Sequence, residues 1–274
     1  NDFVFLKTFG EKGDEEQLLS LLNAILKKTG RDTLTSIEII ESRTITGEVI
    51  GDKTSILDVV ANTSDGTRIH IEVQLRDYGN MNNRSLFYWS REYAGELSRG
   101  EDYDQLRKVI VINIVNFAVV AVDDFHTTFH LWEDTYKDFL LTDALEMHFI
   151  DIKKFNKLLE KDLRNNPLHR WLTFLDQNTG ENTLKEVTAM DAAIQKADER
   201  MNFLANDKEA LRLYHLREMA RIDYNSGMKK AKAEGKAEEK AEIAKSMLKD
   251  GMAPEMAAKY TGLPLELVRQ LNQQ

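Results

Sequence analysis

Two short segments joined by a turn constrain the fold more than any other part of the chain. Residues 56–60 are apolar except for Asp58, and residues 68–74 alternate strictly between apolar and polar side chains. Both patterns favour β-strands, and the Asp-Gly dipeptide between them is typical of a hairpin turn. Asp58 and Glu72 lie in the middle of these strands, where a buried carboxylate is costly unless it is paired or binds a metal. The sequence therefore predicts a β-hairpin with two carboxylates that need partners.

The length of the hairpin loop decides where these carboxylates point. A two-residue loop, 65–66, places Asp58 and Glu72 on opposite faces of the sheet. A three-residue loop, 64–66, with Gly66 in the left-handed conformation, places Asp58 opposite Glu72 with Cβ atoms about 5 Å apart. We predict the three-residue loop.

Two carboxylates at this separation repel each other, and a shared cation is the natural way to offset the repulsion. Gln74 comes next along the same face of the strand, two residues after Glu72. Asp58, Glu72 and Gln74 are therefore predicted to share one face of the sheet.

An Asp on one strand and Glu-x-Gln on the next resembles the PD-(D/E)XK nuclease superfamily, with Gln74 in place of the usual Lys. Further segments resemble, in order, the Rpn family, which is also described as PD-(D/E)XK nuclease family transposases or recombination-promoting nucleases. The similarity covers nearly the whole chain. The segments that carry it are Asp2 to Gly10, Leu21 to Leu26, Ile71 to Gln74, Arg84 with Tyr88, and Gly100 to Tyr103.

This resemblance implies an α/β fold: a restriction-endonuclease-like core with a mixed β-sheet flanked by helices, followed by a helical C-terminal region. It implies a DNA endonuclease that hydrolyses phosphodiester bonds and uses Mg²⁺ or Mn²⁺. Asp58, Glu72 and Gln74 would be catalytic, and Asp58, Glu72 and the carbonyl of Val73 would bind the metal. Gln74 can orient a water but supplies no positive charge, for which Arg84 would partly compensate.

Arg84 and Tyr88 lie four residues apart on one helix face, after the hairpin. The resemblance implies that both bind nucleic acid at the site. The alternatives are a surface cation for Arg84 and a core aromatic ring for Tyr88.

Composition narrows the class of protein. The chain has 274 residues, a net charge of −9 and no cysteine. The negative charge argues against a protein that coats DNA, so contact with DNA requires a local basic patch or a metal. Absence of cysteine fits a reducing cytoplasm, and no apolar run approaches the ~20 residues of a membrane helix. We therefore expect a cytoplasmic protein that does not enter a membrane.

Five further polar residues have alternative interpretations. His126 and His130 would share a strand face, but no third ligand has suitable spacing, so a zinc site is not favoured. His70 shares the face of Glu72, either at the rim of the site or as an exposed polar residue. Asn23 is a satisfied polar residue at a helix margin, or else it or Glu16 lies near the metal.

We expect three parts: a nuclease domain (1–155), a helical extension (156–228), and a charged helix with a small helix-turn-helix-like tail (229–274). The tail would either bind DNA or form a homodimer through the C-terminal helices. Two rival functions follow: a catalytically weak DNA-binding module and a dimeric assembly protein on a nuclease fold.

Beside the hairpin, strands are expected at 36–43, 106–115, 127–132 and 146–150, and helices at 2–10, 14–28, 81–97, from 166, and at 184–204, 208–224, 228–247, 254–260 and 264–271.

Overall fold

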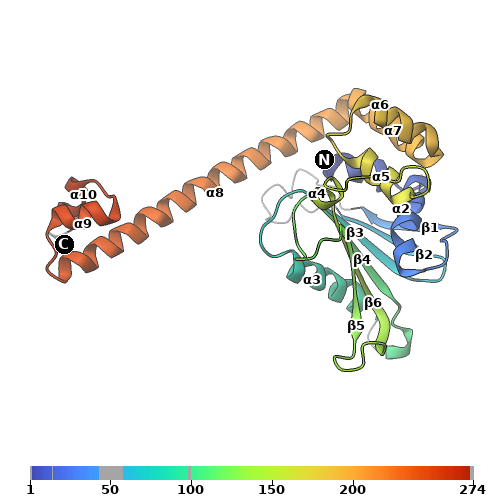
Figure 1. Ribbon diagram of the computed structural model, residues 1–274, viewed down its shortest axis with the longest axis horizontal. Helices are drawn as coiled ribbons and strands as arrows, with labels where there is room; N and C mark the ends of the chain where they lie inside the picture. Colours follow the sequence, from blue (N-terminus) through green and yellow to red (C-terminus); the bar gives the residue numbers. More distant parts are fainter. Residues whose placement is uncertain (1, 14, 43–57, 98–99, 272–274) are drawn as a thin grey trace. The chain divides into compact units, whose positions relative to one another are not determined.

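A computed structural model describes residues 2–13, 15–42, 58–97 and 100–271 (Figure 1). The chain divides into two compact units, Asn1–Leu211 and Arg212–Gln274, and the boundary falls within one long helix. The helix N-cap expected at Asp14 and the loop expected at 44–51 lie outside the described residues. No helix within the described ranges is long and apolar enough to cross a membrane.

The first unit is built on a mixed β-sheet, as predicted. The described residues give six strands in the order β1-β2-β3-β4-β6-β5. The three central strands β3, β4 and β6 are parallel, and the outer strands pair antiparallel. The strands are β1 (Ile37–Ser42), β2 (Asp58–Thr63), β3 (Arg68–Gln74), β4 (Val109–Val115), β5 (His126–Trp132) and β6 (Leu140–Asp151).

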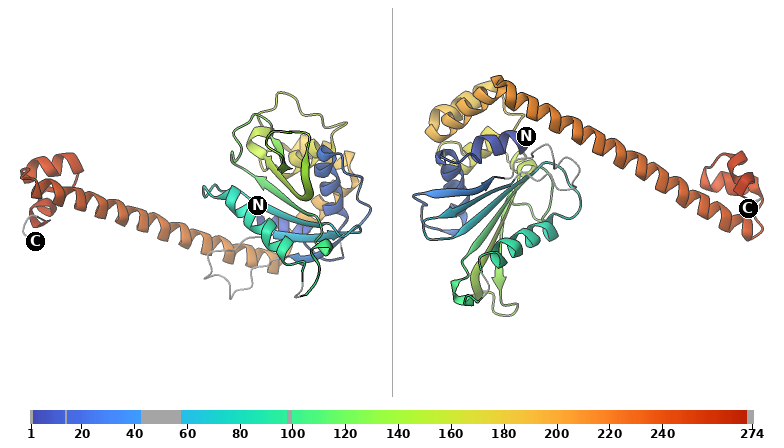
Figure 2. Two further views of the ribbon diagram at one scale, coloured as in Figure 1. Left: turned by 90° about the horizontal axis from the view of Figure 1, so that it is seen from below. Right: turned by 180° about the vertical axis from the view of Figure 1, so that it is seen from behind.

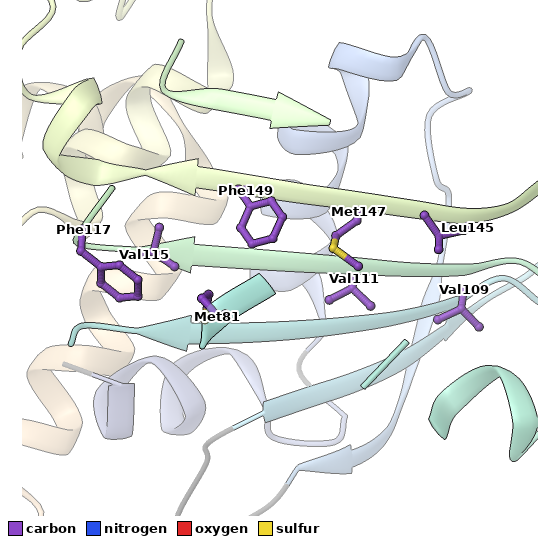
Figure 3. Close-up of a cluster of buried hydrophobic side chains, with 8 residues drawn as sticks. All are labelled: Met81, Val109, Val111, Val115, Phe117, Leu145, Met147 and Phe149. Carbon is purple, nitrogen blue, oxygen red and sulfur yellow. The ribbon is translucent and has the colours of Figure 1, made fainter. Parts of the chain in front are cut away.

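Strand β4 lies at the centre because nearly all of its side chains are aliphatic. All seven of its residues are buried, as expected for a strand covered on both faces. Helix α3 (Met81–Ala94) packs on one face, over an apolar cluster drawn in Figure 3. The cluster consists of Met81, Val109, Val111, Val115, Phe117, Leu145, Met147 and Phe149.

The opposite face is covered by α1 (Asp2–Phe9), α2 (Glu16–Leu26) and α5 (Pro167–Leu175), as the two views in Figure 2 show. Trp171 is fully buried there, with its ring edge-on to Phe9 at 5.5 Å and its Nε1–H donating to Ser20 Oγ at 3.2 Å. Asn166 caps α5 by accepting hydrogen bonds from the first two free N–H groups. A single aromatic side chain thus ties α5 to α1 and α2.

Asn23 in α2 is a satisfied polar residue. Its Nδ2 donates to the Leu34 carbonyl at 3.0 Å, and its Oδ1 accepts from the Leu34 N–H at 2.7 Å. Glu16 forms an ion pair with Lys196 on the surface. These contacts favour the reading of Asn23 as a satisfied residue, and a position of either residue near the metal stays a prediction.

The remaining helices differ from expectation in two places. The helix expected at 184–204 is two helices, α6 (Glu181–Met190) and α7 (Ala192–Asn206), because the Asp191 side chain accepts hydrogen bonds from the next N–H groups and starts a new helix. The helices expected at 208–224 and 228–247 are one, α8 (Lys208–Lys249). Glycine costs only about 1 kcal/mol in a helix interior, and the surrounding Ala, Glu and Lys offset it. Short helical segments are η1 (Lys27–Thr29), η3 (Tyr103–Gln105) and α4 (Ile152–Phe155).

The second unit ends in a small helical pair, α9 (Pro254–Thr261) and α10 (Leu265–Leu271). Ala257 and Val268 bury their side chains against Ala244 of α8. Gly262 joins the helices at a positive φ of 65°, a conformation that favours glycine. Arg269 pairs with Glu255 at 3.0 Å, so the one cation of α10 is engaged within the unit.

Candidate functional site

The hairpin adopts the predicted three-residue loop. The Thr63 N–H donates to the Thr67 carbonyl at 2.9 Å, and Gly66 between them has a φ of 82°. Asp65 accepts a hydrogen bond from the Thr67 N–H at 3.0 Å, which braces the turn. The resulting register places Asp58 opposite Glu72. Directly paired positions of an antiparallel ladder share one face, as predicted, although the side chain of Asp58 lies outside the described part of the structure.

Glu72 is completely buried, and its charge is balanced by Arg84 of α3. The Arg84 Nη2 lies 2.6 Å from the Glu72 Oε1, and the Arg84 side chain is only 17% exposed. A carboxylate in this position is costly without such a partner. Arg84 is therefore turned toward the predicted catalytic carboxylate, and is not the freely solvated cation of the alternative reading.

Helix α3 is held over the site by a buried polar contact. Ser85 Oγ lies 2.9 Å from both the Met81 carbonyl and Asn113 Oδ1, and Asn113 Nδ2 donates to the His148 carbonyl at 3.0 Å. Asn113 is the register partner of Glu72 in β4. The contact explains why a buried Asn interrupts an otherwise aliphatic strand: it docks α3 at the level of Glu72.

Tyr88 is a core residue at this helix–sheet interface. Its ring is 4% exposed and stacks on His70, with centroids 4.9 Å apart and planes 20° apart. The guanidinium groups of Arg84 and Arg91 lie 5.7 and 5.2 Å from the ring centroid, within range of cation–π attraction. Tyr88 thus supports Arg84, and its contact with nucleic acid stays a prediction.

His70 is fully buried, so the expectation of an exposed polar residue is wrong. Its Nδ1 lies 3.6 Å from Glu92 Oε1, and Arg91 Nη2 lies 2.7 Å from the same oxygen. Burial acts to raise the pKa of Glu92, but hydrogen bonds from His70 and Arg91 outweigh it and lower the pKa to about 2. Sequence spacing missed Glu92, because two of its partners, Arg68 and His70, come from β3.

Gln74 ends the strand on the face of Glu72. Its Nε2 donates to the Arg76 carbonyl at 2.9 Å, and its own carbonyl accepts from the Asn116 N–H after β4 at 3.2 Å. Successive carbonyls of a strand point to opposite sides. The Val73 carbonyl therefore faces the β2 side, where Asp58 is paired with Glu72.

The donor set fits a hard divalent cation. Carboxylate and carbonyl oxygens are the ligands that Mg²⁺ prefers, and the register brings the positions of Asp58, Glu72 and Val73 to one end of the β2–β3 pair. Among the described side chains, which exclude Asp58, no group of three or more His, Cys, Asp or Glu could hold a metal. A metal site here thus depends on Asp58.

A second buried polar cluster lies on the opposite face of the sheet. Glu146 Oε1 lies 2.7 Å from His148 Nε2, His148 Nδ1 lies 2.9 Å from His126 Nε2, and Glu146 Oε2 lies 2.6 Å from Lys108 Nζ. His130 Nε2 is 3.8 Å from Glu146. The two histidines singled out from the sequence thus meet a third through the fold. The spacing of Glu146 and His148, two residues apart in one strand, is the sequence signal that could have predicted this cluster.

Protonation of this cluster opposes folding. Burial, followed by the charges of His148 and Lys28, lowers the pKa of His126 to about 3, and burial also lowers the pKa of His148. Below pH 6.5 the unfolded chain therefore binds more protons than the folded chain, so stability is full above that pH and falls as the pH drops toward 3.

We expect the free energy of unfolding to fall by about 2 kcal/mol between pH 7 and pH 5 from His126 alone. Urea unfolding at several pH values measures this slope. His126→Gln should flatten it, and the same change at exposed His215 should not. An unfolding free energy that stays constant from pH 7 to pH 5 would contradict the assignment.

A comparison with known protein families shows which family the chain belongs to. A protein-family model described as PD-(D/E)XK nuclease family transposase matches residues 1–231. No curated protein and no solved structure matches the chain. The match spans the sheet, the hairpin with Glu72, and the helices as far as the first half of α8. The chain belongs to the PD-(D/E)XK nuclease family transposases.

Proposed function

We propose that this protein is a metal-dependent DNA endonuclease that hydrolyses phosphodiester bonds with Mg²⁺ or Mn²⁺. The observation that carries the proposal is the pairing of Asp58 with Glu72 at one end of the β2–β3 ladder, in a chain of a nuclease family. Strand cleavage of this type would serve transposition or recombination.

Asp58, Glu72 and the Val73 carbonyl would hold the cation. When bound, such a cation activates a water and neutralises charge that develops on the phosphate oxygens. Glu72 is suited to this role because its carboxylate is fully buried and the Arg84 guanidinium holds it in place. Gln74, at the end of the same strand, would orient the attacking water through its amide oxygen.

Arg84 would act in two states. Without substrate it balances the charge of Glu72, from which it is 2.6 Å away. If Glu72 held a cation, the guanidinium would no longer have to balance its charge and would bind the scissile phosphate through two parallel N–H groups. The stacked rings of Tyr88 and His70 beneath it limit the directions it can take.

Incubation with supercoiled plasmid tests the proposal. The wild-type protein should convert supercoiled DNA to nicked circles in Mg²⁺ or Mn²⁺ and leave it intact in EDTA. Nicking that persists in EDTA would refute metal dependence. Binding without nicking in either metal would favour the catalytically weak DNA-binding module.

The C-terminal helices support the alternative of a dimeric tail. Beyond Gly227, the apolar side chains of Met228, Ile243 and Tyr260 are each at least 44% exposed, and exposed apolar side chains that gather on one surface can mark a binding interface. A chain ending at Gly227 should therefore have a lower oligomeric state in light scattering and keep its nicking rate per site. If the tail binds DNA instead, truncation should weaken DNA binding and reduce its salt dependence. Loss of solubility would contradict both roles.

A further inference from the structure

A cavity of about 310 Å³ lies at the carboxyl ends of β3 and β4, on the face of the sheet opposite Glu72. Its walls include the rings of Phe5, Phe9 and Phe174, which are at most 7% exposed. Its volume is at the lower end of the range for ligand pockets, about 300–1,000 Å³. The cavity therefore has the size and apolar walls of a site for a small, flat molecule.

Polar side chains gather at the solvent-facing part of the lining. Asn116, Gln177 and Asn178 line the cavity and are exposed, so they mark its mouth. Amide side chains both donate and accept hydrogen bonds, which suits them to the edge of a nucleobase. An aromatic wall with an amide rim fits a molecule whose faces are apolar and whose edge is polar.

The cavity adjoins the proposed catalytic centre through a single hydrogen bond. The Asn116 N–H at its mouth donates to the Gln74 carbonyl at 3.2 Å. Val73 also lines the cavity, whereas its neighbours Glu72 and Gln74 belong to the other face of the strand. A nucleotide whose phosphate is at the centre could thus place a neighbouring base at this mouth.

One buried hydroxyl lacks a partner in this cavity. Thr8 lines it and is only 3% exposed, and its Oγ1 has no hydrogen-bond partner among the described residues. Buried polar groups are normally paired. A ring nitrogen or carbonyl of a bound base would accept a hydrogen bond from Thr8.

The net charge makes contact with the bases more important. At a net charge of −9 the protein as a whole repels the phosphate backbone of DNA. Stacking of bases on aromatic side chains adds affinity that does not depend on charge. An acidic protein that acts on DNA gains most from this kind of contact where a base is already unpaired, because no pairing has to be broken.

We propose that this cavity binds an unpaired nucleobase next to the scissile phosphate, and that the substrate is DNA with an unpaired base. The proposal rests on the proposed nuclease function. It predicts preference for single-stranded or bulged DNA over intact duplex.

Fluorescence anisotropy tests the preference without cleavage. The wild-type protein, in Ca²⁺, is titrated into two labelled duplexes that differ only by one unpaired base. We expect about tenfold tighter binding of the bulged duplex, as for one good stacking contact. Thr8→Val should reduce this preference about three- to tenfold, and Met201→Trp, which fills the cavity from α7, should abolish it.

Thr173→Val is the matched control. Thr173 is also buried with an unpartnered hydroxyl among the described residues, but it does not line the cavity. It should keep the full preference. Equal affinity of the wild-type protein for both duplexes would overturn the proposal, as would a preference that survives in folded Thr8→Val and Met201→Trp proteins.

The two proposals fail separately. Metal-dependent nicking without a preference for the bulged duplex leaves the nuclease function and overturns the base-binding site. A preference that Thr8→Val weakens, in a protein that never nicks DNA, supports base binding and overturns the nuclease function.

Discussion

Glu72→Gln is expected to abolish metal-dependent nicking, with a rate about 10³-fold below wild type. Glutamine keeps the shape of the side chain and can still accept a hydrogen bond from Arg84, 2.6 Å away. It lacks the negative charge that a divalent cation requires. The fold should therefore survive, and plasmid nicking with thermal unfolding of the same sample measures both effects.

Glu92→Gln is the matched control for this variant. Glu92 is a second buried carboxylate on the same helix–sheet interface, paired with Arg68, Arg91 and His70. It lies away from the end of the β2–β3 pair, so its loss should lower stability and leave the nicking rate of the folded protein within a few-fold of wild type. Equal loss of activity in both variants would mean that Glu72 acts only through the structure.

Glu146→Ala should have the largest effect on stability. Glu146 is 1% exposed and contacts Lys108, His148 and Thr29. Removing one member of a buried charged network leaves the others without a partner and costs about 3–5 kcal/mol. For a unit of this size the melting temperature should fall by about 10 °C.

The control for this substitution is Glu160→Ala, which removes an exposed carboxylate from the same unit. Its effect should stay within about 0.5 kcal/mol. Burial acts to raise the pKa of Glu146, but hydrogen bonds from His148 and Lys108 outweigh it and hold this pKa well below its usual range. If both variants have the melting temperature of the wild type, the cluster contributes no net stability.

The hairpin shows what could be predicted from sequence. Register follows from local rules: strand alternation, an Asp-Gly turn and a left-handed Gly66. These rules place Asp58 opposite Glu72 without information on any long-range contact, as the register confirms. The mixed sheet and its flanking helices followed from the family resemblance and from the aliphatic run of β4.

The partners of the site could not be predicted in the same way. The pair of Glu72 with Arg84 joins residues from a strand and a helix, and the pair of His126 with His148 joins residues 22 positions apart on two strands. Spacing within one element carries no information on such contacts. Helix ends were also uncertain, because capping by Asp191 divides a helical stretch that periodicity alone reads as continuous.

The nicking activity of the Asp58→Asn variant is the most direct test of the proposed centre, because the register pairs Asp58 with Glu72. Wild-type protein and Asp58→Asn protein, purified in parallel, are incubated with supercoiled plasmid in Mg²⁺. This comparison also exposes any contaminating nuclease, which both preparations would share. The account predicts nicking by the wild type and no conversion above buffer by Asp58→Asn. Equal nicking by the two proteins would contradict it.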